Sequence, residues 1–519
     1  MNFANHVEFQ AADRPDELAI TDPKREMSYA ELDAETSAVA NGLAALGVAP
    51  GDRVALFLPN LTTFLTSYLG AMKLGAIPVP INLRFGQAEI AHVVTDADPA
   101  AIAVFDEAAP AFAEKPLDAE LVVVGDEVPE GTTPYGGLVA DAEKSFEIES
   151  RLDSAVAEIL YTSGTTGRPK GVQHTHGNLG ANARGGRALM GYGPDTSFLT
   201  VAPCFHASGL NATTTPSLVH GAENHFLPEW DPELALRTMA ERDVTYTMMI
   251  PTMVLDLLEH GTEGYDLSAF ESLNVGGSPM PAERIAEAEA ALGCDLYEGY
   301  GMTEVTLGAA GNRPGQDVYK AGSIGTVAGP WAEGRIEDPE TGEAVAQGEK
   351  GELLWRGDVV MKGYWNLPEK NDEVFVERPA PPEQAGGGGE AAERESKEWL
   401  RSGDIGHVDE DGHLFLDDRI DDMFISGGEN VYPREIEDVI YELDGVREAA
   451  VVGTPHERLG EQVTAIVRGD VTADEVEAVC RGALADYKVP REIHVRDDPL
   501  PQTATMKLDK VALRDEYGG

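Results

Sequence analysis

Cysteine is scarce in this chain, with three thiols among 519 residues. Cys204, Cys294 and Cys480 are widely separated and lack metal-binding spacing, so they predict neither a disulfide framework nor a metal site. We expect three packed, reduced thiols. No base is paired with Cys204 by any sequence signal, so we interpret it as a packing residue rather than a nucleophile.

Long apolar runs are also absent. No segment approaches the roughly 20 consecutive apolar residues that a membrane-spanning helix needs. Residues 1–20 lack the basic stretch and apolar core of a secretory signal. We therefore expect a cytoplasmic protein without an integral membrane segment.

Basic residues are few, because 39 Lys and Arg stand against 91 Asp and Glu, giving a net charge of −52. No basic patch stands out, which argues against a nucleic-acid partner. The hydrophobic content of 42% is too high for a disordered chain. At about 1 M salt the Debye length falls to about 3 Å, which screens the repulsion between surface carboxylates. The composition therefore predicts a halophilic protein from a salt-rich cytoplasm.

Most of residues 1–419 alternate short apolar runs with helical patterns. Residues 53–58 and 76–81 predict buried strands on either side of a helix at 62–74, which is typical of parallel pairing. Further strands are predicted at 100–105, 121–125 and 158–162. The fold class is therefore α/β, with residues 1–419 forming a large N-terminal α/β domain of several subdomains.

A different pattern occupies residues 420–519. Pro433 is tolerated in a first helical turn. Apolar residues then recur with helical spacing at Ile436, Val439, Ile440 and Leu443. A strand is predicted at 449–453, and Thr472 with Glu475 forms a capping-box pattern before another helix. We expect a small, mobile C-terminal α+β domain.

Residues 377–398 belong to neither pattern. They are rich in Pro, Gly and Glu and have almost nothing to bury. We expect a mobile surface loop without a function.

The strongest chemical signal is YTSGTTGRPKGV at residues 161–172. Glycines let the backbone turn sharply, and successive N–H groups with hydroxyls can bind phosphate oxygens. The residues of this predicted phosphate loop are Thr162, Ser163, Gly164, Thr165, Thr166 and Gly167, with Lys170 supplying a positive charge. Lys170 lies between Pro169 and Gly171, so the spacing is not that of a P-loop NTPase.

Seven further motifs follow the phosphate loop in order. They are APCFHASGL (202–210), VGGSPMP (275–281), YEGYGMTE (297–304), GELLWRGDVVMKGYW (351–365), WLRSGDIGHVDEDGHLFLDDR (399–419), IDDMFISGGENVYPREIE (420–437) and LPQTATMK (500–507). With these motifs the chain resembles, over essentially its whole length, the adenylate-forming superfamily of acyl-CoA synthetases, aryl-CoA ligases, adenylation domains and firefly luciferase.

The resemblance implies a nucleotide site. Glu304 is a hard oxygen ligand suited to Mg²⁺, and Thr303 becomes a phosphate donor. Asp404 is expected to bind the ribose hydroxyls, with Arg419 near the ribose and phosphate. Tyr300 is expected to place its ring against adenine. The remaining predicted nucleotide-binding residues are Gly276, Gly277, Ser278, Glu298 and Gly299.

The resemblance also implies catalytic and moving parts. Lys507 is expected to bridge the substrate carboxylate and the α-phosphate, although Met506 replaces the glycine usual before it. His206 is expected where the acyl and pantetheine sites meet. Asp421 is the expected hinge of the small domain, and Gly427 and Gly428 would line the pantetheine channel after its rotation.

The leading interpretation is a carboxylic acid–CoA ligase that uses ATP, Mg²⁺ and CoA and forms an acyl-AMP intermediate. We expect a medium- or long-chain fatty acid, bound near residues 206–213 and 305–309. Alternatives are an aryl acid–CoA ligase, an adenylation enzyme that loads a separate carrier protein, and, least favoured, a non-catalytic adenylate-binding protein. We expect no fused carrier domain. The sequence is compatible with a homodimer but does not decide the oligomeric state.

The charge balance leads to a first testable prediction. Catalytic rate and melting temperature should both rise as KCl is increased into the molar range, because screening removes self-repulsion. Thermal unfolding and initial rates across a KCl series measure this. Highest stability in salt-free buffer would contradict the halophile interpretation.

Overall fold

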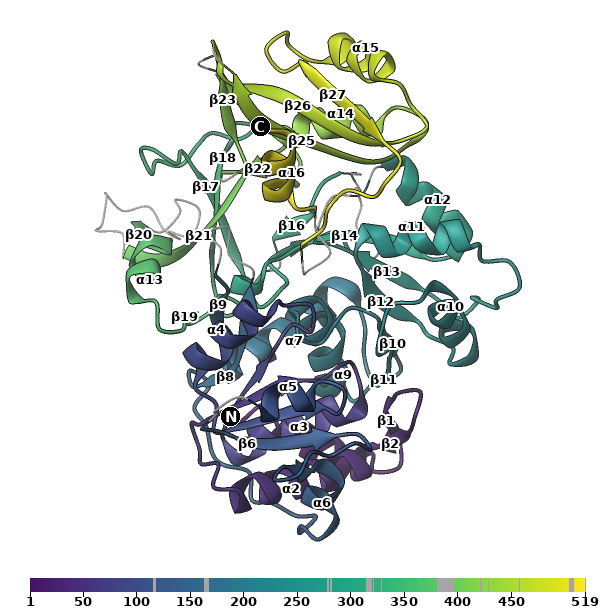
Figure 1. Ribbon diagram of the computed structural model, residues 1–519, viewed down its shortest axis with the longest axis vertical. Helices are drawn as coiled ribbons and strands as arrows, with labels where there is room; N and C mark the ends of the chain where they lie inside the picture. Colours follow the sequence, from purple (N-terminus) through teal and green to yellow (C-terminus); the bar gives the residue numbers. More distant parts are fainter. Residues whose placement is uncertain are drawn as a thin grey trace, which may run out of the picture.

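The computed structural model describes residues 1–519 apart from 115–117, 163–167, 278–279, 281, 314–319, 321, 328, 380–395, 421, 428, 457, 504–507 and 519. The described chain forms a large mixed α/β domain and a smaller C-terminal domain, which lies at the opposite end of the molecule from the N-terminal region (Figure 1). The predicted fold class is confirmed.

The N-terminal region contains a parallel five-stranded sheet with the order β4-β3-β5-β6-β7. Its strands are β3 (Arg53–Phe57), β4 (Ile77–Pro80), β5 (Ala101–Phe105), β6 (Glu120–Val124) and β7 (Thr133–Pro134). Helix α3 (Thr62–Leu74) follows β3, packs on α2 (Tyr29–Ala45) and ends at Gly75, whose φ is 78°. The strands and the helix predicted in this region are confirmed.

A nine-stranded sheet has the order β16-β15-β14-β13-β12-β10-β11-β1-β2. In the same order, its strands are Thr326–Val327, Ala310–Gly311, Asp295–Tyr300, Ser272–Val275, Tyr246–Met249, Ser197–Thr200, Glu223–Phe226, Leu18–Thr21 and Glu26–Ser28. The strands from β1 to β14 along this order are parallel, so their carboxyl ends share one edge, where ligands bind in open α/β sheets.

Helices connect and flank these two sheets. They are α1 (Asn5–Asp13), α4 (Gln87–Ala97), α5 (Ala109–Ala113), α6 (Tyr135–Ala140), α7 (His176–Met190), α8 (Ala207–Gly209), the π-helix η1 (Leu210–Thr214), α9 (Thr215–His220), α10 (Pro232–Glu241), α11 (Pro251–His260), α12 (Ala282–Leu292) and the 3₁₀ turn η2 (Thr303–Val305).

A three-stranded antiparallel sheet carries the phosphate-loop motif. Its order is β19 (Gly363–Tyr364), β9 (Lys170–Thr175) and β8 (Val156–Thr162). Strands β8 and β9 form a hairpin in which Thr162 is opposite Lys170. The motif therefore bridges two paired strands.

An antiparallel sheet links the large domain to its C-terminal neighbour, and the sequence did not indicate it. Its strands are β17 (Glu333–Glu337), β18 (Gly351–Arg356), β20 (Phe375–Pro379), β21 (Ser396–Val408) and β22 (Leu414–Arg419), with α13 (Pro368–Val374) before β20.

The prediction that residues 377–398 form a loop is wrong at both ends of this range. Glu377 pairs with Glu398 and Pro379 with Ser396, and residues 380–395 lie outside the described chain. Strand pairing needs backbone hydrogen bonds rather than apolar side chains, so a polar composition did not prevent it.

The C-terminal domain is a five-stranded sheet with three helices. Its strands are β23 (Phe424–Ser426), β24 (Glu429–Val431), β25 (Val446–His456), β26 (Gly460–Gly469) and β27 (Glu492–Arg496), and its helices are α14 (Pro433–Tyr441), α15 (Ala473–Ala483) and α16 (Lys510–Tyr517). The capping box of Thr472 and Glu475 is confirmed. Helix α14 ends two residues before Leu443, because its last turn unwinds toward Gly445 (φ 96°).

The three cysteines are buried free thiols, as predicted. Burial raises the pKa of the Cys204 thiol to about 12, which keeps it protonated and unreactive. Within the described ranges, no helix combines the length and the apolar character needed to cross a bilayer.

Candidate active site

A large cleft lies where the nine-stranded sheet, the β8–β9 hairpin, the β17–β22 sheet and the C-terminal domain meet. It is lined by most of the described residues that the motifs singled out: Thr162, Lys170, His206, Gly276, Gly277, Glu298, Gly299, Tyr300, Thr303, Glu304, Asp404 and Arg419. Residues more than 250 positions apart in sequence are thus gathered around one cavity.

Two residues of the predicted phosphate loop lie at the strand ends that the loop connects. Thr162 ends β8, Lys170 begins β9, and both line the cleft. The Lys170 Nζ atom lies 4.9 Å from the centroid of the Tyr364 ring. The predicted Ser163, Gly164, Thr165, Thr166 and Gly167 lie outside the described residues.

The turn η2 presents Thr303 and Glu304 to the cleft. The Tyr364 hydroxyl donates a hydrogen bond to Glu304 Oε1 at 2.8 Å. Burial and this neighbouring carboxylate raise the pKa of Tyr364 well above its usual value, so the hydroxyl stays a donor. The backbone N–H of Met361 donates to the Glu304 carbonyl at 2.8 Å. Side chain and backbone of Glu304 are thus both fixed.

The donor set at Glu304 fits magnesium. Mg²⁺ usually takes one or two protein carboxylates and completes its shell with phosphate oxygens and waters. Glu304 is a carboxylate with 8% exposure beside the phosphate-loop hairpin, and one of its oxygens is oriented by Tyr364. A bound Mg²⁺–ATP can therefore use Glu304 without a dedicated protein cage.

The chain leaves η2 through a strained turn. Thr306 has φ 54° and Leu307 has φ 98°, both in the left-handed region that non-glycine residues rarely occupy. The Thr306 hydroxyl donates to the Val359 carbonyl at 2.7 Å and holds the turn. A Cβ on Gly301 would lie 1.0 Å from the Leu307 carbonyl oxygen, so only glycine fits there. This packing brings Leu307 and Gly308 to the cleft wall.

Asp404 is held by its neighbours in an orientation toward the cleft. Its Oδ2 accepts from the Tyr300 hydroxyl at 2.5 Å, and its Oδ1 lies 3.4 Å from Arg419 Nε. The Ser402 hydroxyl accepts from the Asp404 N–H at 3.0 Å and donates to the Leu353 carbonyl at 2.7 Å. Asp404 and Arg419 are opposite each other in the β21–β22 ladder, which explains why the two motif residues meet.

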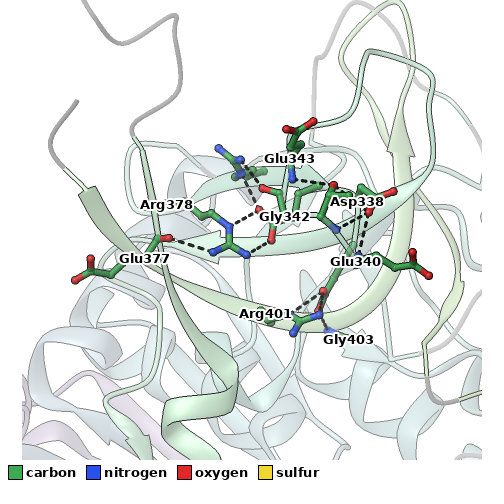
Figure 2. A network of polar contacts seen from close by, with 12 residues as sticks. Asp338, Glu340, Gly342, Glu343, Glu377, Arg378, Arg401 and Gly403 are labelled. Carbon is green, nitrogen blue, oxygen red and sulfur yellow. Dashed lines mark hydrogen bonds and ion pairs between the residues drawn. The ribbon is translucent and has the colours of Figure 1, made fainter. Parts of the chain in front are cut away.

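Polar contacts surround Arg378, Arg401 and Gly403 in the sheet that carries Asp404 (Figure 2). Glu352 accepts two hydrogen bonds from Arg401, at 2.9 and 2.6 Å, and one from the Gly403 N–H at 3.2 Å. Glu337 accepts a bidentate pair from Arg378 at 2.8 and 2.6 Å. Paired in this way, both carboxylates tolerate burial, and Glu352 fixes Gly403, the residue before Asp404.

Tyr300 has one face against protein. Its ring stacks on Trp355 with centroids 5.4 Å apart and planes at 26°. Gly276 directly follows β13, and Gly299 lies in the neighbouring strand β14. A Cβ on Gly276 would lie 3.1 Å from the Gly299 carbonyl oxygen. The glycine therefore allows a close backbone approach at the carboxyl edge of the sheet. Gly277 continues this wall with φ 89°, and the predicted Ser278 lies outside the described residues.

Glu298 is a buried carboxyl group at the cleft. Burial raises its pKa to about 7, even though the Gly322 N–H donates to its Oε2 at 2.9 Å. Near neutral pH this side chain can therefore either donate or accept a hydrogen bond toward a ligand.

His206 lies at the start of α8. The Ser208 N–H donates to His206 Nδ1 at 3.3 Å, and the Ser208 hydroxyl is 3.0 Å from the same atom. Both residues line the cleft together with Asn211, Ala212, Leu307 and Gly308, which supports the predicted acid-binding region. Thr213, Val305 and Ala309 of the same predicted ranges are buried and do not appear among the described lining residues.

The C-terminal domain contributes the segment that contains the predicted catalytic lysine. Gln502 and Leu508, on either side of it, line the cleft and form an isolated antiparallel bridge. Lys507, Asp421 and Gly428 lie outside the described residues. Gly427 has φ 64° and its N–H donates to Leu459 at 3.0 Å, but among the described residues it is not part of the cleft lining. Of these described residues, Gln502 and Leu508 thus line the cleft and Gly427 does not.

Sequence reasoning missed several supporting residues. Tyr364 lies within a quoted motif, yet nothing in the motif indicates that it orients Glu304. Trp355 and Glu352 act from a sheet that was not predicted. Glu158 carried a usable signal, because a carboxylate in an otherwise apolar strand needs a buried partner. That partner, His174, is the residue opposite it in the hairpin.

Comparison with known protein families shows which family the chain belongs to. Residues 7–365 match the model of the AMP-binding enzyme family, and residues 435–507 match that of the AMP-binding enzyme C-terminal domain. The chain belongs to the AMP-binding enzyme family.

Relatives of this AMP-binding enzyme are CoA ligases. A feruloyl-CoA synthase of an Amycolatopsis species is 35% identical over 497 residues, which cover 95% of this chain and 94% of that protein. A long-chain-fatty-acid–CoA ligase of Mycobacterium tuberculosis is 32% identical over 509 residues, covering 95% and 93%. The crystal structure of ATP-bound MatB from Rhodopseudomonas palustris aligns with a TM-score of 0.87 at 32% identity, covering 100% of this chain and 99% of that one.

The AMP-binding enzyme is therefore an AMP-forming carboxylic acid–CoA ligase, and ATP and CoA fit as its co-substrates. The resemblance predicted from the motifs is confirmed at the level of the family and the reaction class.

Proposed function

We propose that this enzyme activates a hydrophobic carboxylic acid in two half-reactions at the single cleft described above. The acid first forms acyl-AMP, and CoA then takes the acyl group. The observation that carries the proposal is the meeting of Thr303, Glu304, Asp404 and Arg419 in one cleft, which Gln502 and Leu508 of the C-terminal domain also line.

In the first half-reaction, a carboxylate oxygen of the acid attacks the α-phosphorus of ATP and pyrophosphate leaves. Two anions must approach each other, so catalysis consists mainly of positioning and positive charge. Lys507 is proposed to bridge the carboxylate and the α-phosphate. Residues 162–167 and Lys170 bind the β- and γ-phosphates, and Thr303 donates to the α-phosphate.

The nucleoside is proposed to lie between the two glycine-lined strand ends and the β21–β22 hairpin. Asp404, already oriented by Tyr300, accepts from the ribose hydroxyls, and Arg419 interacts with the ribose and phosphate. The free edge of the Tyr300 ring, Glu298 and residues 276–278 surround the adenine. Glu304 would hold Mg²⁺, which, when bound, neutralises phosphate charge and favours departure of pyrophosphate.

The second half-reaction needs the small domain, residues 420–519, to rotate on residues 1–419. The proposed hinge is Asp421, directly after β22 ends at Arg419. Rotation removes Lys507 and brings Gly427 and Gly428 to the channel for pantetheine. The CoA thiol then attacks the acyl carbonyl beside His206, the carbonyl–oxygen bond breaks, and AMP leaves with that oxygen.

The acid is proposed to be a medium- or long-chain fatty acid. Gly308 adds no side chain to the pocket wall, whereas Leu307 narrows it, and a Cβ on Gly308 would lie 3.4 Å from Asn182 Oδ1. The similarity to the long-chain-fatty-acid–CoA ligase of Mycobacterium tuberculosis supports this choice. An aryl acid is the second candidate, and the feruloyl-CoA synthase favours it.

A panel of acids tests the acyl substrate. Octanoate, palmitate, ferulate, indoleacetate and acetate are compared by pyrophosphate release with and without CoA. The proposal expects the highest kcat/KM for octanoate or palmitate and CoA-dependent turnover. A higher kcat/KM for ferulate would favour an aryl acid as the substrate and contradict the fatty-acid proposal. Pyrophosphate release that CoA does not accelerate would favour a carrier protein as the acyl acceptor.

The division of labour between the half-reactions is also testable. Lys507→Ala should slow acyl-AMP formation by about 100-fold or more, since one transition-state charge contact contributes about 3–4 kcal/mol. It should still convert supplied acyl-AMP and CoA into product. Gly428→Leu should do the reverse, because its side chain would obstruct the channel. Rapid quench with acyl-AMP quantified separates the two rates.

Matched controls for this pair are available in the same chain. Lys24→Ala removes an exposed lysine far from the cleft, and Gly482→Leu adds the same side chain in α15, where nothing lies within 4 Å of its Cβ. Both controls should leave the two rates unchanged. Equal slowing of both half-reactions by Lys507→Ala and by Gly428→Leu would contradict the rotation mechanism.

A further inference from the structure

A buried acid–base pair connects the phosphate-loop hairpin to the catalytic turn. Glu158 in β8 and His174 in β9 are cross-strand neighbours, and both side chains have 0% exposure. His174 Nδ1 is 2.7 Å from Glu158 Oε1, and its Nε2 is 2.6 Å from the backbone carbonyl oxygen of Thr303. One imidazole thus joins two strands to the turn that carries Glu304.

The carboxylate of Glu158 is surrounded by hydrogen-bond donors. The Tyr68 hydroxyl donates to its Oε2 at 2.6 Å, and Asn211 Nδ2 donates to its Oε1 at 3.0 Å. Burial and the charge of Glu158 raise the pKa of Tyr68 well above its usual value, so this hydroxyl remains a donor. With His174 added, three hydrogen-bond partners surround one buried carboxyl group and fix its position.

The hydrogen-bond partners also determine where the protons of His174 are. A backbone carbonyl oxygen can only accept, so Nε2 must carry a hydrogen. The other nitrogen, Nδ1, shares a hydrogen with Glu158 Oε1. Both ring nitrogens are therefore engaged, and the imidazole is held between β8 and the turn that carries Thr303.

We propose that His174, held by Glu158, is a positioning residue that fixes the Thr303 carbonyl and thereby aims Thr303 and Glu304 at the nucleotide. This inference rests on the proposed role of that turn in acyl-AMP formation. Neither residue of the pair lies among the described lining of the cleft, so the pair acts through the turn rather than by touching substrate.

The same carboxylate also reaches the acid side of the cleft. Asn211, which donates to Glu158, belongs to η1 and lines the cleft. Its backbone carbonyl accepts from Asn182 Nδ2 at 2.7 Å, and Asn182 lines the cleft near Gly308. The Glu158–His174 pair therefore relates the position of the bound acid to that of the phosphates, which in-line attack requires.

His174→Gln tests the positioning role in the full-length enzyme. It should lower kcat for acyl-AMP formation about 10- to 100-fold, as loss of a residue that orients a ligand-binding group typically does. The KM for ATP should change by only a few-fold, because the lost interaction matters most in the transition state. Rapid quench across an ATP series gives both constants.

His225→Gln is the matched control. His225 is also a buried strand histidine with both ring nitrogens engaged, Nδ1 at 2.8 Å from the Thr21 hydroxyl and Nε2 at 3.1 Å from the Ser197 hydroxyl, and it does not belong to the described cleft lining. It should lose comparable thermal stability yet keep kcat within about twofold of wild type. If His174→Gln retains as much kcat as His225→Gln, His174 is a structural residue and the proposal fails.

Ring ¹⁵N NMR of histidine-labelled wild-type enzyme at pH 7 provides a readout that does not depend on turnover. The His174 signals, assigned from whichever of His174→Gln and Glu158→Gln folds, should show a hydrogen on Nε2, because the Thr303 carbonyl oxygen can only accept. An unprotonated Nε2 would overturn the contact with the turn and with it the proposal. Wild-type enzyme that forms no acyl-AMP from any acid would instead refute the proposed function while leaving this result intact.

Discussion

The active site depends on one buried contact, the pairing of Glu158 with His174 across the hairpin that carries the phosphate loop. Buried polar groups are stable only when they are hydrogen-bonded, and removal of one partner leaves the other unsatisfied. Here Tyr68, Asn211 and the Thr303 carbonyl complete the set. The pair thereby fixes strands, catalytic turn and acid pocket relative to one another.

Around this contact, three sheets place their functional ends at one cleft. The parallel strands of the nine-stranded sheet contribute glycines that permit close backbone approach, and the β21–β22 ladder contributes Asp404 and Arg419 as opposite residues. Gln502 and Leu508 of the C-terminal domain also line the cleft. The last strand of the large domain ends at Arg419, so the proposed ribose-binding residue and the proposed hinge are two positions apart in the sequence.

The sequence was sufficient where local pattern determines structure. The strand at 53–58, the helix at 62–74 and the capping box at Thr472 follow from periodicity and turn chemistry, and ordered motifs predicted the cleft residues. It was insufficient where partners are remote. Nothing local to Tyr364, Glu352 or His174 indicates that they orient Glu304, Gly403 or Thr303, because those contacts arise only after sheets have packed. Composition also misjudged 377–398, whose ends pair through backbone groups.

The central claim is that the acid is activated as acyl-AMP before CoA reacts, and an isotope measurement tests it most directly. The enzyme is supplied with acid carrying ¹⁸O in both carboxylate oxygens, together with ATP and CoA, and the products are examined by mass spectrometry. Attack of the carboxylate on the α-phosphorus, followed by thiol attack on the carbonyl, predicts one ¹⁸O in the AMP phosphate per turnover. Label found in pyrophosphate or in free phosphate, with unlabelled AMP, would contradict the account.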